Sequence, residues 1–282
     1  MIDLHAHTNE SDGSCPPLEL VDRALRMGLE ALAISDHDTF AGYDQALAGA
    51  RKYGLDLVCG IELSTRSETD RRRLSVHLLA YFLHAPPTEE FRTWLEELLA
   101  ARRDRNRRLI ERIQSMGVNI DLSEVENLGK TLTGRPHFAR VLVRKGYAAN
   151  RDEAFRKYLD ESAPSYVELH GVDIAIGIQR IIAAGGLPVV AHPVRLGFRD
   201  ALAEDIYIGK LGDAGLRGLE VYHSDHAAQD VARYAALAKK YGLAITGGSD
   251  FHGDTKPRVE LGRGVDGNLN IPLSVLENLR AA

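Results

Sequence analysis

Cysteine, tryptophan and long apolar runs are all scarce in this chain of 282 residues. Its two cysteines, Cys15 and Cys59, lack the spacing of a thiolate metal site, and Cys59 lies in an apolar run, so we expect reduced, structural thiols. No segment reaches the roughly 18 consecutive apolar residues of a membrane span, and none has the pattern of a signal peptide. We therefore expect a cytoplasmic protein that has no membrane partner.

A surplus of positive charge is also missing, because the formal net charge is −5. This balance argues against stable binding of duplex nucleic acid through a basic surface. It does not exclude a small phosphorylated ligand, since dications inside a site would reverse the local sign of the charge. Arginines are dense at residues 71–73 and 102–112, and we interpret these runs as a solvated loop and a solvated helix face.

Short apolar runs that end in polar residues recur along the chain. Such a run is typical of a buried parallel strand whose carboxyl end opens into a site. Helical patterns separate most of the runs, and this alternation predicts an α/β fold with a parallel sheet or barrel, in which chemistry gathers at the carboxyl ends of the strands. The runs occupy residues 2–8, 31–38, 55–62, 74–82, 187–193, 218–224 and 243–252.

Residues 86–162 break this rhythm. Residues 89–116 are long, charged and helix-favouring, with a stop at Gly117, and shorter helices are predicted at 136–145 and 151–159. Loops on the carboxyl side of a barrel often carry such additions. We therefore predict an inserted helical subdomain at 86–162 that covers the active site of a barrel formed by residues 1–85 and 163–282.

Residues that can bind metal gather at the ends of the predicted strands. His5 and His7 are two residues apart on a strand, so their side chains point to the same side and can grip one ion. Nitrogen and carboxylate ligands without thiolate suit Zn²⁺, Mn²⁺ or Fe²⁺. Nine candidates are too many for one ion, which indicates two or three ions sharing a carboxylate. The candidates are His5, His7, Asp12, His37, Glu62, His77, His192, Asp250 and His252.

These motifs together resemble those of the PHP (polymerase and histidinol phosphatase) family. The matching segments are His5-Ala6-His7 with Asp12-Gly13, Ser35-Asp36-His37-Asp38, Gly60-Ile61-Glu62, His77, Ala191-His192-Pro193 and Ser249-Asp250-Phe251-His252. The resemblance implies a distorted seven-stranded β/α barrel that holds three divalent ions, which we take to be Mn²⁺, with Zn²⁺ or Fe²⁺ as alternatives.

The same resemblance divides the nine residues among the three ions. It assigns His5, His7, Glu62 and Asp250 to the first ion. Glu62, His77 and His192 would hold the second, and Asp12, His37 and His252 the third. Asp12 stands where some members have a histidine, and Asp12 and His37 are also catalytic candidates as holders of that ion.

The stretches 133–140 and 155–159 resemble a narrower branch of the family, which includes phosphatases of nucleoside 3′,5′-bisphosphates and exonucleases that trim short RNA from the 5′ end. Arg135 and Arg195 are our candidates for binding phosphate, because a guanidinium offers forked donors. We prefer His226 as the catalytic acid, and His137 for substrate binding, with His223 as a further candidate for either task. His84 and His170 are interpreted as structural.

The expected activity is hydrolysis of a phosphate ester by a metal-activated hydroxide that attacks phosphorus. Its substrate would be a phosphorylated small molecule, a nucleotide or a short oligonucleotide. We prefer the 3′-phosphate of nucleoside 3′,5′-bisphosphates and short 5′-phosphorylated RNA. Two alternatives remain at this stage: a histidinol-phosphate phosphatase, and a non-catalytic, metal-stabilised module like those that serve polymerases.

Overall fold

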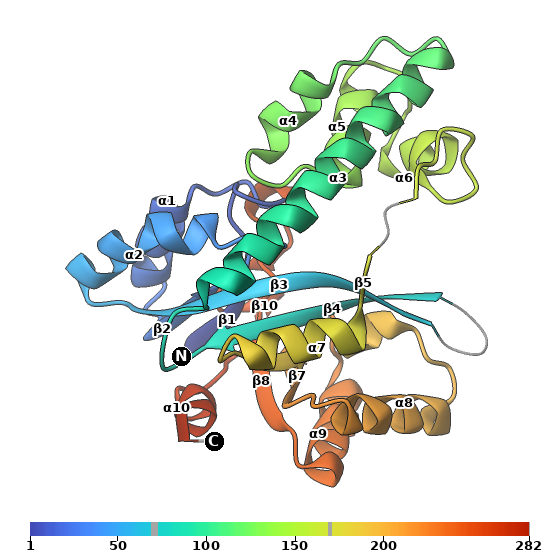
Figure 1. The fold of residues 1–282 in the computed structure, drawn as a ribbon. Coiled ribbons are helices and arrows are strands. Elements are labelled where there is room, and N and C mark those ends of the chain that lie inside the picture. The colour runs from blue at the N-terminus through green and yellow to red at the C-terminus, as the bar shows by residue number, and fades with distance from the viewer. Residues whose placement is uncertain (69–72, 169–170, 282) are drawn as a thin grey trace.

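The computed structural model describes residues 1–68, 73–168 and 171–281. Within these ranges, seven strands follow one another in a single barrel-like sheet, as the resemblance implied (Figure 1). In sheet order they are β1 (Ile2–Ala6), β2 (Ala31–Ile34), β3 (Asp56–Glu68), β4 (Arg73–Phe82), β6 (Leu187–Val190), β7 (Gly218–His223) and β8 (Ala244–Gly248). A short strand, β5 (Val172–Asp173), pairs with the far end of β3.

The first strand and the segment that follows the last strand close the barrel. The backbone N–H of Asp250 donates to the carbonyl of His5 (2.8 Å), and that of His7 donates to the carbonyl of Phe251 (2.9 Å). The approach is closest at Gly248, where an added Cβ would lie 2.3 Å from the backbone nitrogen of His5. A residue without a side chain is therefore required at this point of the ring.

Strand β4 departs from the predicted alternation of parallel strands and helices. It follows β3 without an intervening helix and pairs antiparallel with both β3 and β6, with Cys59 opposite Phe82 at one end of the β3–β4 ladder. Antiparallel neighbours need only a short connection, whereas a parallel pair needs a long crossover. The predicted alternation of strands and helices is thus interrupted between β3 and β4. Glu62 lies within the long strand β3 rather than at its end, whereas His77 lies inside β4, as the sequence predicted.

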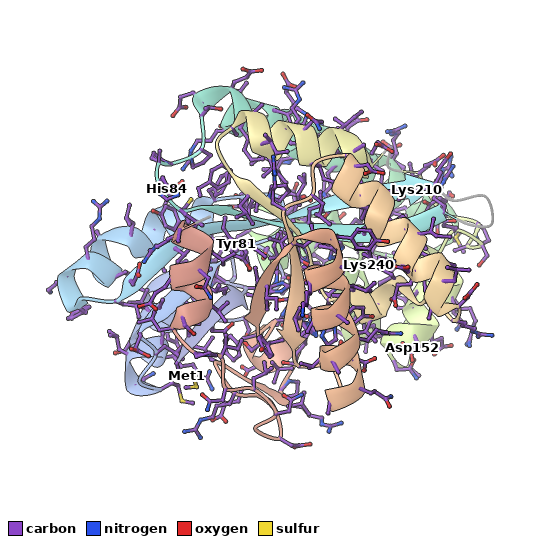
Figure 2. All side chains as sticks on the ribbon, turned by 90° about the horizontal axis from the view of Figure 1, so that it is seen from below. Met1, Tyr81, His84, Asp152, Lys210 and Lys240 are labelled. Carbon is purple, nitrogen blue, oxygen red and sulfur yellow. The ribbon has the colours of Figure 1, made fainter. Side chains whose placement is uncertain are left out.

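Helices pack around the sheet (Figures 1 and 2). They are α1 (Pro17–Arg26), α2 (Ala41–Tyr53), α7 (Ile174–Ala183), α8 (Ala201–Asp213), α9 (Ala228–Tyr241) and α10 (Ser274–Ala281), with short 3₁₀ turns at η2 (Pro193–Leu196) and η3 (Gly253–Thr255) and a small hairpin of β9 (Val259–Glu260) and β10 (Gly264–Val265). Along β1, Ile2 and Leu4 join a buried apolar cluster, while the alternate residues Asp3 and His5 enter the polar site.

A group of helices lies above the sheet in Figure 1 and has an apolar core of its own. They are α3 (Glu89–Ser115), α4 (Leu122–Gly129), α5 (Arg135–Arg144), α6 (Arg151–Ala154) and the π-helical turn η1 (Phe155–Leu159). The three helices predicted in this stretch are therefore present. Leu109, Ile113, Val125 and Phe138 are almost fully buried where α3, α4 and α5 meet. The division of the chain into a barrel and an inserted subdomain stays a prediction.

Among the described residues, no helix combines the length and the apolar character needed to cross a membrane. The two cysteines are free and buried, as expected for thiols that serve packing.

Barrel closure gives a testable prediction. We expect Gly248→Ala to lower the free energy of unfolding by about 1 to 3 kcal/mol or more, because the new methyl group would overlap the backbone of His5. Urea unfolding of the metal-free protein, followed by circular dichroism, would measure the change. Gly212→Ala in α8 is the matched control: its Cβ meets no atom within 4 Å, so it should leave stability unchanged or raise it by about 0.5 to 1 kcal/mol. Equal stability of the two variants would contradict this account of closure.

Candidate metal centre

Glu62 lies at the centre of the candidate metal site and is 1% exposed. Its two carboxylate oxygens face different imidazoles. Oε2 lies 3.0, 3.2 and 3.4 Å from Nε2 of His7, His5 and His37, and Oε1 lies 2.8 Å from His77 Nδ1 and 2.8 Å from His192 Nε2. A carboxylate with both oxygens so placed has the arrangement needed to bridge two ions.

The residues predicted for the first ion converge on one point. His5 Nε2 and His7 Nε2 are 3.1 Å apart, and Asp250 Oδ1 lies 3.6 and 3.4 Å from these two nitrogens. Ligand atoms bound about 2.1 Å from a single ion stand about 3.0 to 3.4 Å apart in octahedral or tetrahedral geometry. The distances among His5, His7, Glu62 and Asp250 therefore fit an ion held between them.

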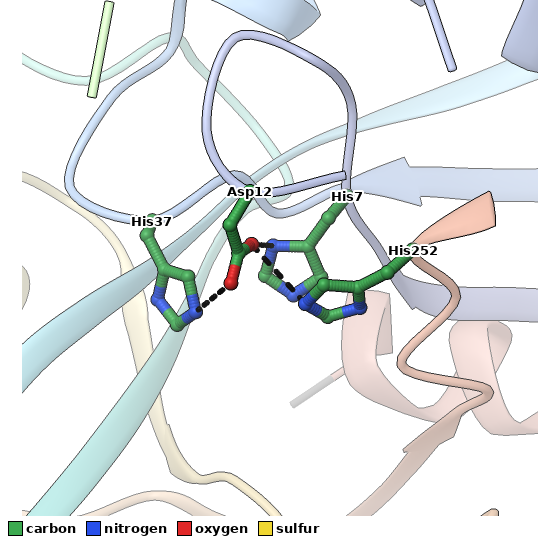
Figure 3. A group of neighbouring side chains, drawn as sticks. All are labelled: His7, Asp12, His37 and His252. Atoms are coloured by element: carbon green, nitrogen blue, oxygen red, sulfur yellow. Dashed lines mark ion pairs between the residues drawn. The ribbon is translucent and has the colours of Figure 1, made fainter. Parts of the chain in front are cut away.

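The residues predicted for the third ion form a neighbouring group, with His7 as an additional member (Figure 3). Asp12 Oδ1 lies 3.1 Å from His252 Nε2 and 3.6 Å from His7 Nδ1, and Asp12 Oδ2 lies 3.8 Å from His37 Nε2. The structure thus brings all nine predicted residues into one continuous cluster. Their division among ions stays a prediction.

Burial and neighbouring charges shift the pKa values of several groups in the cluster. Burial lowers the pKa of His37 to about 4 and that of His192 to about 3, which favours the neutral imidazoles that ligate metal. Burial would also lower the pKa of His7, but the carboxylates of Asp250 and Glu62 raise it to about 9. The cluster therefore concentrates negative charge that a cation would neutralise.

Glu220 supports the cluster from behind, and the sequence analysis missed it. Its Oε1 lies 2.9 Å from His5 Nδ1, and its Oε2 accepts the backbone N–H of His192 (2.6 Å). Burial would raise the pKa of Glu220, but His5 and His223 facing it lower the pKa to about 2. An ionised carboxylate keeps the proton on Nδ1 of His5 and leaves Nε2 free to bind metal. The available signal was an acidic residue inside an apolar strand.

Two further buried carboxylates fix the backbone that carries the ligands. Asp3 accepts hydrogen bonds from the N–H and the hydroxyl of Ser249 (2.9 and 2.6 Å), which joins β1 to the last ligand segment. Asp36 accepts from the N–H of Thr8 (2.8 Å) and the hydroxyl of Ser11 (2.6 Å), which holds the loop before Asp12. Burial raises the pKa of both carboxyls, and the hydrogen bonds from these donors oppose that shift.

A cavity of about 510 Å³ opens over the cluster and is bounded on its other side by α3, α5 and η1. Its cationic side chains form two groups. Arg195 and Lys256 lie beside the metal cluster, where both contact Asp250 Oδ2, at 2.8 and 2.7 Å. The second group comes from β3 and the helices above the sheet and consists of Arg66, Arg102, Arg105, Arg135 and Arg151.

The arginine run at 102–112 is not simply a solvated helix face, so that interpretation is wrong for two of its members. Arg105 is 3% exposed, and Arg102 pairs with Asp38 beneath α3. The two arginines lie between Leu98 and Leu109 at spacings of three or four residues. Residues so spaced share one face of a helix, so both arginines lie on the apolar face of α3. This spacing was the signal in the sequence. Of the run at 71–73, residues 71 and 72 lie outside the described residues.

The predicted substrate residues Arg135, His137 and Arg195 all line the cavity. Arg135 Nη1 donates to the carbonyl of Leu159 (3.2 Å), and the buried His137 accepts at Nδ1 from the N–H of Gly134 (3.0 Å). Arg195 pairs with Asp250. Their positions suit contact with a ligand in the cavity, which stays a prediction.

His226 and His223 are not among the residues that line this cavity. His226 lies behind His223, with a ring separation of 5.3 Å, and its Nδ1 is 2.8 Å from the carbonyl of Val221. His223 is fully buried and reaches Asp250 Oδ2 at 3.5 Å. A catalytic acid must come within hydrogen-bond reach of its substrate, so the geometry does not favour the role predicted for His226. His84 is exposed (Figure 2), and His170 lies outside the described residues.

Glu10 ties the loop of Asp12 to the helices above the sheet. Its side chain is buried and accepts from the hydroxyl of Thr131 (2.6 Å) and from Lys130 Nζ (3.4 Å), while its carbonyl accepts the N–H of Leu132 (3.0 Å). The loop between α4 and α5 and the ligand loop are therefore held together by both backbone and side chain.

An α/β barrel that gathers imidazoles and carboxylates around a shared Glu62 belongs to the class of metal-dependent hydrolases built on such barrels. The PHP domain model matches residues 3–161. The chain belongs to the PHP domain family, as its motifs indicated.

Relatives cover nearly the whole chain. A 5′-3′ exoribonuclease of Haemophilus influenzae is 32% identical over 265 residues, covering 94% of this chain and 94% of the relative. A 3′,5′-nucleoside bisphosphate phosphatase of Chromobacterium violaceum is 31% identical and covers 89% of this chain and 87% of the relative. A solved structure from Bifidobacterium adolescentis, assigned as a metal-dependent phosphoesterase, is 32% identical, with a TM-score of 0.79 and coverage of 97% and 96%.

Because Glu62 lies between two sets of imidazoles, we expect its substitution to remove bound metal and activity together. Elemental analysis of the purified protein should find more than one transition ion per chain. Glu62→Gln should lose at least one ion and the phosphoesterase activity together, because an amide is a weaker ligand than a carboxylate and cannot bridge as one. Glu126→Gln, which removes only an ion pair with Arg103, is the matched control and should keep both. A Glu62→Gln protein with full metal content would show that no ion depends on this carboxylate.

Proposed function

We propose that this protein hydrolyses the 3′-phosphate of nucleoside 3′,5′-bisphosphates, releasing a nucleoside 5′-monophosphate and inorganic phosphate, and that short 5′-phosphorylated RNA is a further substrate. The observation that carries the proposal is a single cavity with a ligand cluster on one side and a separate group of arginines on the other. The activities for which the two relatives are named support the same two substrate classes.

The donor set fits three divalent ions, which we propose to be Mn²⁺. His5, His7, Glu62 and Asp250 would hold the first, Glu62, His77 and His192 the second, and Asp12, His37 and His252 the third. Bound there, such ions would acidify a water toward neutral pH and offset the charge of the phosphoryl oxygens. Asp12 and His37 would act in catalysis through the ion that they hold.

Arg195 would bind the reacting phosphate. Its guanidinium is anchored by Asp225 (2.6 Å) and Asp250 (2.8 Å), so the side chain is already oriented beside the cluster. These two carboxylates use only part of its five donors, and the remaining donors can meet a phosphate in the forked geometry that it accepts.

The second arginine group provides a site for the phosphate that does not react. Arg105 is almost fully buried, and its Nε has no hydrogen-bond partner among the described residues. Burial, together with the positive charges of Arg102 and Arg135, lowers its pKa to about 9. A buried guanidinium whose Nε has no partner is costly, and an anion in the cavity would relieve that cost. A 5′-phosphate supplies such an anion, while His137 lies on the same helix as Arg135 and would contact the bound nucleotide.

Residues 86–162 would form the subdomain that carries this second site over the barrel 1–85 and 163–282. The contacts of Glu10 with the loop before α5 would keep the two phosphate sites at a fixed separation. Binding energy from the 5′-phosphate would then orient the 3′-phosphate at the cluster.

Histidinol phosphate fits this cavity less well. It carries one phosphate and one ammonium group, and the side of the cavity opposite the cluster is rich in arginine, which would repel the ammonium. A non-catalytic module is also disfavoured, because the cluster faces an open cavity that a substrate can enter.

Arg135 gives a test of the second phosphate site. We expect Arg135→Ala to lower kcat/KM for adenosine 3′,5′-bisphosphate by the equivalent of about 1.5 to 3 kcal/mol, because one charge-assisted hydrogen bond is lost. Metal content should not change. Arg108→Ala removes an exposed arginine of α3 that pairs only with Asp104 among the described residues, and it should leave the kinetics unchanged. If the kinetics of Arg135→Ala are unaltered, Arg135 does not bind the substrate and serves only to hold the carbonyl of Leu159.

Substrate preference tests the proposed function itself. Purified, Mn²⁺-loaded protein should release phosphate from adenosine 3′,5′-bisphosphate far faster than from adenosine 3′-monophosphate, with a higher kcat as well as a lower KM, because the 5′-phosphate orients the reacting group. Histidinol phosphate serves as the competing substrate. Equal rates for the two nucleotides would show that the 5′-phosphate does not orient the reacting group. A higher kcat/KM for histidinol phosphate would show that histidinol phosphate, not the bisphosphate, is the preferred substrate.

A further inference from the structure

Lys256 follows η3 and lies in the cavity beside the metal cluster. Its Nζ is 2.7 Å from Asp250 Oδ2, and its side chain is 30% exposed. Nothing in its sequence context marks it as functional, since it lies in a polar loop beyond the last ligand, His252.

The two oxygens of Asp250 have separate partners. Oδ1 faces His7 Nε2 and His5 Nε2 at 3.4 and 3.6 Å, whereas Oδ2 meets the cations Lys256 and Arg195. The second oxygen would therefore have a charged partner in Arg195 even without the lysine. An ammonium has three donors, and Asp250 is the only partner found for Lys256 among the described residues, so two donors are left where the side chain borders the cavity.

The distribution of positive charge shows which phosphate these donors would meet. The arginines from β3 and the helices above the sheet form the proposed site for the phosphate that does not react. Of the cavity's lysines and arginines in the described part of the chain, only Arg195 and Lys256 contact a residue of the cluster itself. A phosphate at the cluster would therefore lie next to this pair.

We propose that Lys256 is a catalytic residue that donates hydrogen bonds to the phosphoryl group undergoing hydrolysis. The inference rests on the proposed function in assigning that group as a 3′-phosphate. Water adds to phosphorus, the bond between phosphorus and the ester oxygen breaks, and one proton of that water ends on the departing ester oxygen, so the lysine keeps its own proton throughout. Its fixed positive charge stabilises the negative charge that develops on the phosphoryl oxygens and the leaving oxygen.

The experiment compares Lys256→Met, which keeps the length of the side chain without its charge, with Lys256→Arg, which keeps a charge. Lys239→Met, at an exposed position of α9, is the matched control. Each Mn²⁺-loaded protein is assayed with adenosine 3′,5′-bisphosphate and with p-nitrophenyl phosphate, inorganic phosphate is titrated as a competitive inhibitor, and bound metal is measured.

We expect Lys256→Met to lower kcat/KM about 10- to 100-fold for both substrates and to raise the inhibition constant of inorganic phosphate, because one charge-assisted contact is lost. Metal content should equal that of the unaltered protein, Lys256→Arg should recover part of the loss, and Lys239→Met should behave as the unaltered protein does. If only the aryl phosphate is hydrolysed and its rate still depends on Lys256, the bisphosphate assignment fails while the role of the lysine stands.

Two results would overturn the inference. Loss of bound metal in proportion to activity would mean that Lys256 serves only to position Asp250. An unchanged inhibition constant for inorganic phosphate would mean that its free donors do not reach a phosphate at the cluster.

Discussion

The placement of one buried carboxylate, Glu62, between two sets of imidazoles is the constraint on which the rest of the structure depends. Both oxygens are committed to nitrogen atoms at 2.8 to 3.4 Å, so the residue cannot move without disturbing both sets. Such a packing of ionisable groups is unfavourable in a protein interior unless the scaffold fixes it and cations complete it. The paired strands β3 and β4 provide that rigidity, since both carry ligands within their ladder.

Much of the cluster could be predicted from sequence because its signals are local. His5 and His7 share a strand face, and Asp250 and His252 follow an apolar run, so their convergence needs only the general geometry of an α/β barrel. The antiparallel course of β4 could not be predicted in the same way, since strand direction depends on which distant segments pair. Two other features could not be predicted for the same reason: the burial of Arg105, and the position of His226 outside the cavity lining. Both depend on how α3 and β7 pack against the rest of the protein.

The cationic side chains that line the cavity are held in two different ways. Beside the cluster, Arg195 and Lys256 are held by a carboxylate that also faces the candidate ligands, so these cations are oriented before any ligand arrives. In the second arginine group, the buried Arg105 has the cations Arg102 and Arg135 as neighbours. The first arrangement favours precise contact with a reacting group, whereas the second stores an unfavourable repulsion that an anion can release.

The closure of the barrel by its first strand and the segment after its last strand also affects biosynthesis. The predicted ligands run from His5 to His252, so a growing chain exposes its first histidines long before Asp250 leaves the ribosome. Until Asp250 has been added, the group predicted for the first ion lacks one of its four residues. That group can therefore assemble only after β1 has paired with the segment that follows β8.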